Sequence, residues 1–150
     1  MPRGVSRLQG IRNLFQPDLE QTMRYLCLVY LDEKRLDELP DEDCVEYDTA
    51  IRKSGNCIAS EALESVQTAT TVRVRNGKVS VTDGPFAETK EQLAGFYMIE
   101  ARDLNEATQL ASRIPPARVG SVEVRPIRPI RETVAQAESQ QRTRKPSSSE

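Results

Sequence analysis

The sequence predicts an α+β protein in which two helices cover one face of an antiparallel sheet. Three observations support this prediction: short apolar segments of strand length, two segments with helix start and stop signals, and an Asn-Gly turn between valine-rich segments. The chain has 150 residues and a formal net charge of -2. This length suits one domain with polar ends, and no general positive charge attracts nucleic acid or an anionic membrane.

The first part of the domain has the pattern of a strand, a helix and a second strand. Residues 24–31 are almost continuously apolar and predict a central strand. Residues 41–54 predict a helix with acidic residues in its first turn, basic residues in its last turn and Gly55 as its stop. Residues 57–63 predict a weaker strand.

Residues 32–48, here called the acid-rich segment, carry nine acidic residues against Lys34 and Arg35. One interpretation is a solvated loop followed by a helix start. The other is a docking face for a basic partner. The sequence leaves both interpretations open.

A β-hairpin is predicted in the middle of the chain, where Asn76-Gly77 separates the strand segments 70–75 and 78–82. A two-residue loop of type I′ pairs Arg73 with Ser80 on one face. It places four valines on the other face, which we expect to point inward: Val72, Val74, Val79 and Val81.

The last part of the domain has the pattern of a strand, a helix and a strand. Residues 95–101 predict a strand, and residues 104–114 predict a helix with Asp103 as its N-cap. Residues 119–127 predict the last strand. The order is therefore β-α-β-β-β-β-α-β, which is a ferredoxin-like sandwich with an inserted hairpin.

Two helices cover only one face of such a sheet. The other face is left with large apolar side chains, from among Tyr25, Cys27, Val29, Phe96 and Met98 or their neighbours along the strands. An apolar face of this size is not expected to stay in water. We expect a second copy of the chain to cover it, giving a two-fold homodimer.

The ends of the chain differ from the domain at residues 23–131. Residues 1–22 predict an N-terminal extension that is poorly ordered or forms a short helix, and residues 132–150 predict a disordered polar tail. No signal peptide or membrane-spanning segment is evident, so we expect a cytoplasmic protein. Its three cysteines are then reduced thiols: Cys27, Cys44 and Cys57.

Residues 82–96, TDGPFAETKEQLAGF, resemble the DGPF subgroup of the YCII-related family. The segments ATTVRVRNGKVSVTDGPF, YMIEARDLNEA and GSVEVRPI extend the resemblance over residues 25–127. The resemblance implies a dimeric α+β barrel in which two ferredoxin-like sheets pack face to face. It also implies an association with extracytoplasmic-function sigma factors. The better-known YCII branch has a His-Asp pair proposed to be catalytic, which a chain without His does not contain.

Candidate site residues gather around the turn that follows the hairpin. Asp83 either caps the Gly-Pro turn or acts as a general base in a cleft. Glu88 and Lys90 form either a surface ion pair or part of a site for an anionic ligand. Arg73 either lies in solvent or binds a carboxylate or phosphate. We predict that these four residues bind a small anionic ligand, with Asp83 as the catalytic candidate and with no metal or cofactor.

Two function classes remain, because the absence of His excludes Ser-His-Asp and Cys-His catalysis and imidazole metal ligands. The first is a non-catalytic small-molecule-binding or accessory regulatory dimer, working with a sigma factor. The second is a cofactor-free enzyme that acts on a small organic acid or carbonyl compound through carboxylate, Lys and Arg chemistry. We favour the first, because no substitute for the family's His-Asp pair is evident.

Overall fold

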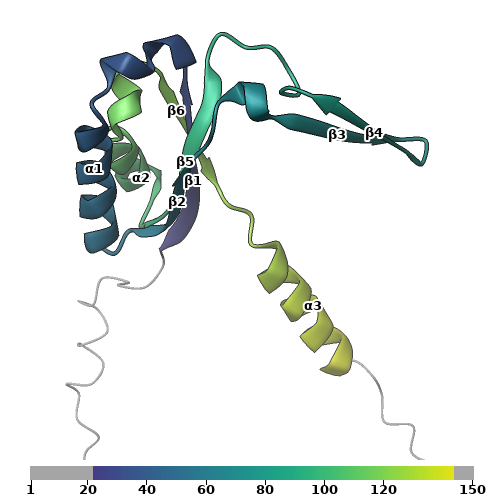
Figure 1. The fold of residues 1–150 in the computed structure, drawn as a ribbon. Helices are drawn as coiled ribbons and strands as arrows, with labels where there is room; N and C mark the ends of the chain where they lie inside the picture. Colours follow the sequence, from purple (N-terminus) through teal and green to yellow (C-terminus); the bar gives the residue numbers. More distant parts are fainter. Residues whose placement is uncertain (1–21, 144–150) are drawn as a thin grey trace, which may run out of the picture.

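The computed structural model describes residues 22–143, and it confirms the predicted α+β class. Helices α1 (Asp41–Lys53) and α2 (Leu104–Ala111) cover one face of a four-stranded antiparallel sheet (Figure 1). In spatial order, the sheet consists of β2 (Cys57–Ala62), β5 (Gln92–Ala101), β1 (Met23–Leu31) and β6 (Ser121–Pro126). This is the ferredoxin-like arrangement. The extension predicted for residues 1–22 lies outside the described residues, apart from residue 22.

The hydrophobic core lies between this sheet and the two helices. Successive side chains of β1 alternate between faces, and Tyr25, Cys27, Val29 and Leu31 are the buried set. The helices add Ile51, Ala107 and Ala111, and Ile114 follows α2, all of them 5% exposed or less. The Tyr47 hydroxyl donates a hydrogen bond to the Leu110 carbonyl oxygen at 2.9 Å, which joins α1 to α2.

The uncovered face, here called the open face, carries part of the expected set. Phe96 and Met98 lie on it, whereas Tyr25, Cys27 and Val29 lie under the helices and their neighbours along β1 take the open side. The register pairs Leu28 with Phe96 and Leu26 with Met98, and directly opposed residues share a face. When nearly every residue of a strand is apolar, the sequence does not show which of the two alternating sets of side chains faces the helices. The open face contains Leu26, Leu28, Tyr30, Leu93, Phe96 and Met98.

The helix boundaries follow the expected signals with one difference. Gly55 has φ +83° and ends α1, as predicted. The Asp103 carboxylate accepts a hydrogen bond from the Glu106 amide at 2.8 Å and begins α2. That helix ends at Ala111 rather than at Ile114, because Ile114 is extended and Pro115 opens a short 3₁₀-helix (Pro115–Arg118). The acid-rich segment contains a second 3₁₀-helix (Glu33–Glu38) ahead of α1.

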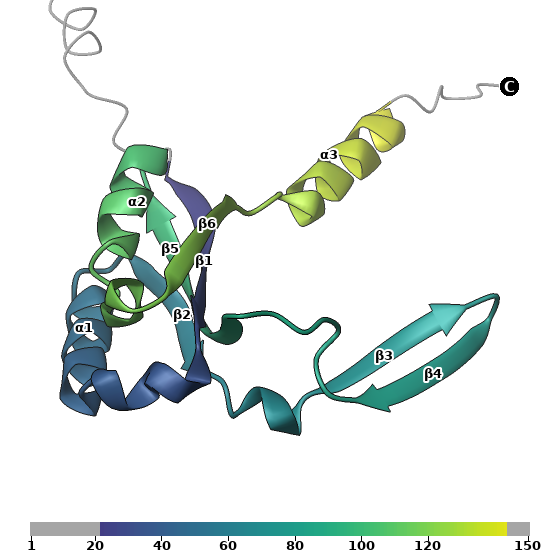
Figure 2. The same cartoon turned by 90° about the horizontal axis from the view of Figure 1, so that it is seen from above.

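The hairpin has the predicted register. Strands β3 (Thr70–Arg75) and β4 (Lys78–Asp83) pair Val72 with Val81 and Val74 with Val79. Asn76 has φ 51° and Gly77 has φ 74°, as a type I′ turn requires. The valines do not point inward, however. β3 and β4 form a separate two-stranded sheet away from the main one, and the four valines are 56–66% exposed (Figure 2).

A third helix, α3 (Ile130–Thr143), occupies part of the segment expected to be a disordered tail. That expectation considered only the lack of apolar side chains. The segment consists mainly of residues that favour helices and contains no Gly or Pro, so it forms a helix although its described side chains, at residues 130 and 134–141, are exposed. Both α3 and the hairpin project from the side of the sheet opposite α1 and α2 (Figures 1 and 2). Among the helices within residues 22–143, none has the length and apolar character needed to cross a bilayer.

Candidate functional site

The loop that follows the hairpin forms one wall of a cavity of about 830 Å³, here called the loop pocket. Asp83, Glu88 and Lys90 line it together, so the structure brings three of the four predicted site residues to one place. Another part of the lining comes from the start of the 3₁₀-helix that follows β1. It adds three residues that the sequence analysis did not assign to a site: Asp32, Glu33 and Lys34.

Arg73 is not part of the loop pocket lining. Its guanidinium Nη2 donates a hydrogen bond to the Phe86 carbonyl oxygen at 3.2 Å. The Arg73 side chain therefore holds the hairpin to the loop that follows it. The sequence placed Arg73 opposite Ser80 correctly, but the register alone did not show in which direction the long side chain extends.

Several polar groups of the loop pocket already have structural partners. The Glu33 carboxylate accepts hydrogen bonds from the Val66 amide at 2.6 Å and the Ser65 hydroxyl at 2.9 Å. Gly84, with φ +96°, donates its amide to the Ala69 carbonyl oxygen at 2.7 Å. Backbone bonding thus holds the turn beside Asp83, whose exposed carboxylate remains able to meet a ligand.

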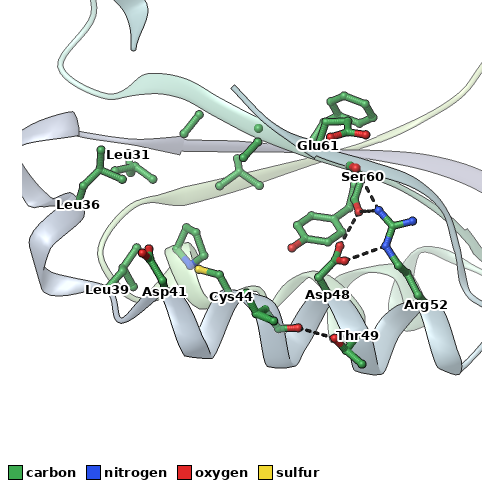
Figure 3. A pocket seen from close by; sticks show the side chains of 18 of the residues that line it. Leu31, Leu36, Leu39, Asp41, Cys44, Asp48, Thr49, Arg52, Ser60 and Glu61 are labelled. Carbon is green, nitrogen blue, oxygen red and sulfur yellow. Dashed lines mark hydrogen bonds and ion pairs between the residues drawn. The ribbon is translucent and has the colours of Figure 1, made fainter. Parts of the chain in front are cut away.

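A second cavity, of about 800 Å³, lies between α1, the 3₁₀-helix before it and the sheet (Figure 3). We call it the helix–sheet cleft. Its apolar walls include Leu31, Leu36, Leu39, Val45, Ala62 and Pro116. Its polar lining includes Asp37, Asp41, Asp48, Arg52, Ser60 and Glu61. An apolar cavity with a few converging polar groups is the usual form of a small-molecule site.

A closed hydrogen-bond network lies at one end of the helix–sheet cleft (Figure 3). The Ser60 hydroxyl donates to Asp48 Oδ1 at 2.6 Å and accepts from Arg52 Nη2 at 2.6 Å. Arg52 Nε donates to Asp48 Oδ2 at 2.8 Å. Asp48 and Arg52 stand four residues apart on α1 and so share a face, and Ser60 on β2 is 6% exposed. The network therefore joins α1 to the sheet.

The network and the surrounding apolar walls set the protonation of nearby groups. The hydrogen bond from Ser60, followed by the hydrogen bond and charge of Arg52, holds the pKa of Asp48 below its usual range. Burial, with the Asp48 charge second, raises the pKa of Tyr97 to about 12. Burial also raises the pKa of the Cys44 thiol, and Asp41 and Asp43 add to this effect. Neither the Tyr97 hydroxyl nor the Cys44 thiol is an activated nucleophile at neutral pH.

The helix–sheet cleft is not evident in the sequence, because its residues come from segments that meet only in the fold. The spacing of Asp48 and Arg52 is visible in the sequence, but their meeting with Ser60 depends on how β2 lies against α1. The acid-rich segment contributes Asp37, Asp41 and Asp48 to the cleft, and neither interpretation of that segment included a cavity. Within residues 22–143, no three Cys, Asp or Glu side chains come together in a way that would hold a metal ion.

Comparison with known proteins covers the part of the chain that forms both cavities. A family model described as the YCII-related domain matches residues 23–131. An uncharacterised protein of Rhizobium meliloti (strain 1021) is 38% identical over 114 residues, which is 70% of this chain and 92% of that protein. The DGPF subgroup stays a prediction from the motif at residues 82–96.

Proposed function

Because the chain belongs to the YCII-related domain family, we propose that it is a non-catalytic, dimeric small-molecule-binding protein whose ligand lies in the helix–sheet cleft. One observation carries the proposal. The cleft combines apolar walls with a closed polar network at one end, in which Ser60 is buried and Asp48 and Arg52 are partly exposed, as in sites that bind and orient small ligands. The loop pocket, by contrast, is lined mainly by exposed polar residues of the turn and loop.

The lining of the cleft indicates the chemical class of its ligand. Asp37 and Asp41 bring negative charge to the cleft, and Asp48 is already paired with Arg52. The ligand proposed for the cleft therefore has an apolar body and a cationic or hydrogen-bond-donating group. This class differs from the small anionic ligand expected for the predicted residues of the loop pocket.

The chemistry of the polar network favours binding over catalysis. The Ser60 hydroxyl already donates to Asp48 and accepts from Arg52, so its hydrogen-bonding capacity is largely used. The lowered pKa of Asp48 makes its carboxylate a weak general base. The chain also has no His to provide the pair proposed for the better-known branch of the family.

A thermal-shift screen with a library of apolar amines and apolar anions tests the proposal. A compound present at a hundred times its Kd stabilises the native state by about 2.7 kcal/mol. Val45→Arg fills the cleft from an α1 position that is 65% exposed, and Leu104→Arg makes the matched change on α2, at a position that is 53% exposed. We expect amines to raise the melting temperature of the unchanged chain and of Leu104→Arg, but not of Val45→Arg. A shift that survives Val45→Arg, or a library with no stabilising amine, contradicts the proposal.

A second candidate function is a cofactor-free enzyme acting on a small organic acid or carbonyl compound. It is favoured by the meeting of Asp83, Glu88 and Lys90 in the loop pocket, where a carboxylate and an ammonium group face the same space. Asp83→Asn preserves the shape of the side chain and removes its charge. For any ligand or substrate of this pocket, we expect at least about tenfold weaker binding or turnover, or roughly 1.4 kcal/mol, with unchanged stability. Unchanged binding and turnover in Asp83→Asn would remove Asp83 from the site.

The proposed protein is a homodimer in which the open faces of two copies meet. The apolar side chains of Leu26, Leu28, Phe96 and Met98 support this part of the proposal, because the described helices leave this face uncovered. An accessory role beside an extracytoplasmic-function sigma factor, in the cytoplasm, is the further element that the DGPF motif contributes. Binding of a purified sigma factor to the dimer, measured by titration calorimetry, tests that role, and the absence of binding at micromolar concentration contradicts it.

A further inference from the structure

The hairpin β3–β4 stands apart from the rest of the chain, and one of its faces carries an exposed patch of four valines, next to the Thr70–Asp83 pair. Val72, Val74, Val79 and Val81 are 60%, 56%, 66% and 62% exposed, and all four lie on that face. A two-stranded hairpin on its own is marginally stable in water, because half of its side chains have nothing to pack against. The valine face therefore requires a cover that the described residues of one chain do not supply.

The direction of the hairpin indicates where this cover comes from. In both views of the fold, the hairpin projects from the side of the sheet opposite α1 and α2, which is the side of the open face (Figures 1 and 2). A second copy seated on the open face then lies beside the hairpin. The valine face and the open face are thus positioned to contact the same neighbour.

The length of the hairpin shows how far along this neighbour it reaches. Each strand has six residues, which span about 20 Å at about 3.3 Å per residue. Two sheets packed face to face lie only about 10 Å apart. A hairpin directed away from its own sheet is therefore long enough to pass the sheet of a second copy and reach the level of its helices.

Charge at the hairpin tip complements the region that it would reach. Arg75 and Lys78 flank the Asn76-Gly77 turn. The acid-rich segment, which carries nine acidic residues against two basic ones, forms the 3₁₀-helix and the first turns of α1 in the helical layer. Within one chain the tip points away from this layer (Figure 2). Arg75 and Lys78 lie on the hairpin face opposite to the valines, at the very end of the hairpin, and would attract the acid-rich segment of a second copy if the tip lay beside it.

We propose that β3–β4 is an arm that grips a second copy of this chain, with its valine face packed on the partner and its basic tip beside the partner's acid-rich segment. This inference rests on the homodimer proposed above and adds a second contact surface to it. It also assigns a basic partner to the acid-rich segment, namely the hairpin tip of the other copy.

Analytical ultracentrifugation of full-length variants tests the valine contact. Val74→Thr combined with Val79→Thr retains β-branched side chains but adds hydroxyl groups to the apolar face. Ser80→Thr is the matched control on the opposite face. We expect the double variant to raise the dimer Kd at least about tenfold and the control to leave it unchanged. A monomeric unchanged chain overturns the homodimer itself. A dimer that tolerates the double variant overturns only the arm.

Zero-length carbodiimide cross-linking tests the position of the tip. The experiment uses dimers reconstituted from equal amounts of ¹⁴N- and ¹⁵N-labelled chains, so that mixed-isotope peptide pairs identify links between copies. We expect Lys78 to form mixed-isotope links with residues 32–48, while Lys53, at the end of α1, serves as the control that forms none. Links from Lys78 that occur only within one chain, or no links in an intact dimer, overturn the proposed position of the arm.

Discussion

Cys27 shows how burial changes the chemistry of a single side chain. This residue lies on the central strand β1 and is 0% exposed. Burial, with a smaller contribution from Cys57, raises the pKa of its thiol to about 11. An unfolded cysteine ionises near pH 8.5, so the folded chain retains a proton that the unfolded chain releases.

This difference predicts a loss of stability in alkaline solution. The contribution of Cys27 is fully present below about pH 8.5 and is lost as the pH rises through about 11, because the folded state then binds more protons than the unfolded state. We expect the free energy of unfolding to fall by about 3 kcal/mol from this residue across that range. Urea unfolding at several pH values measures it. Cys27→Ala is less stable at neutral pH but declines less steeply, and equal slopes would contradict this assignment.

The residues of the two cavities differ in how far the sequence alone predicts that they meet. Asp83 ends β4, and Glu88 and Lys90 lie on the loop that follows, all within eight residues, so their meeting in one cavity follows from local chain geometry. The network of Asp48, Arg52 and Ser60 was not predictable in this way. It depends on the packing of β2 against α1, which in turn depends on the whole sheet order.

Among the structural elements, the β3–β4 hairpin allows a direct test of its predicted turn type. Gly77 has φ +74°, and no atom lies within 4 Å of where its Cβ would be. A substitution there therefore costs conformational energy rather than causing a clash. We expect Gly77→Val to destabilise the hairpin by about 1 kcal/mol or more, because a β-branched residue disfavours positive φ. Amide hydrogen exchange of Arg73 and Ser80, a pair whose amides bond across the strands, measures this change, and unaltered exchange would contradict the turn type.

The elements differ in how far local sequence determines them. The hairpin register was predictable because two adjacent segments and a two-residue turn fix it. The surroundings of its valines were not predictable, since nothing within residues 70–83 specifies what packs on them. Helix α3 was not predicted, although its local sequence was sufficient to indicate it. Its residues favour a helix locally, and the prediction relied on the absence of apolar side chains to bury.

At the scale of the whole molecule, the open face gives the test of assembly. Leu28 stands in the middle of this face, directly opposite Phe96 and Glu123 on the neighbouring strands. Leu28→Glu places a carboxylate beside Glu123 and within the proposed interface, which would typically bury about 1,500 Å². We expect the dimer Kd to rise at least about a hundredfold, because an unpaired charge is then desolvated. Sedimentation velocity measures the change.

Leu104→Glu on α2 is the matched control for this variant, because Leu104 is already 53% exposed on the helical side. It should sediment as the unchanged chain does. Equal dimerisation of Leu28→Glu and the unchanged chain would place the contact between copies elsewhere.

The position of β1 in the sheet has a consequence for synthesis of the chain. β1 lies between β5 and β6, yet it is made first, and β5 is complete only at residue 101. At about 5–20 residues per second, a ribosome needs roughly 4–14 seconds to make the intervening residues 32–101. During that interval the most apolar strand of the nascent chain has no partner on either edge. The two strands of the β3–β4 hairpin are close together in the sequence. The hairpin is therefore able to form before the four-stranded sheet from which it projects.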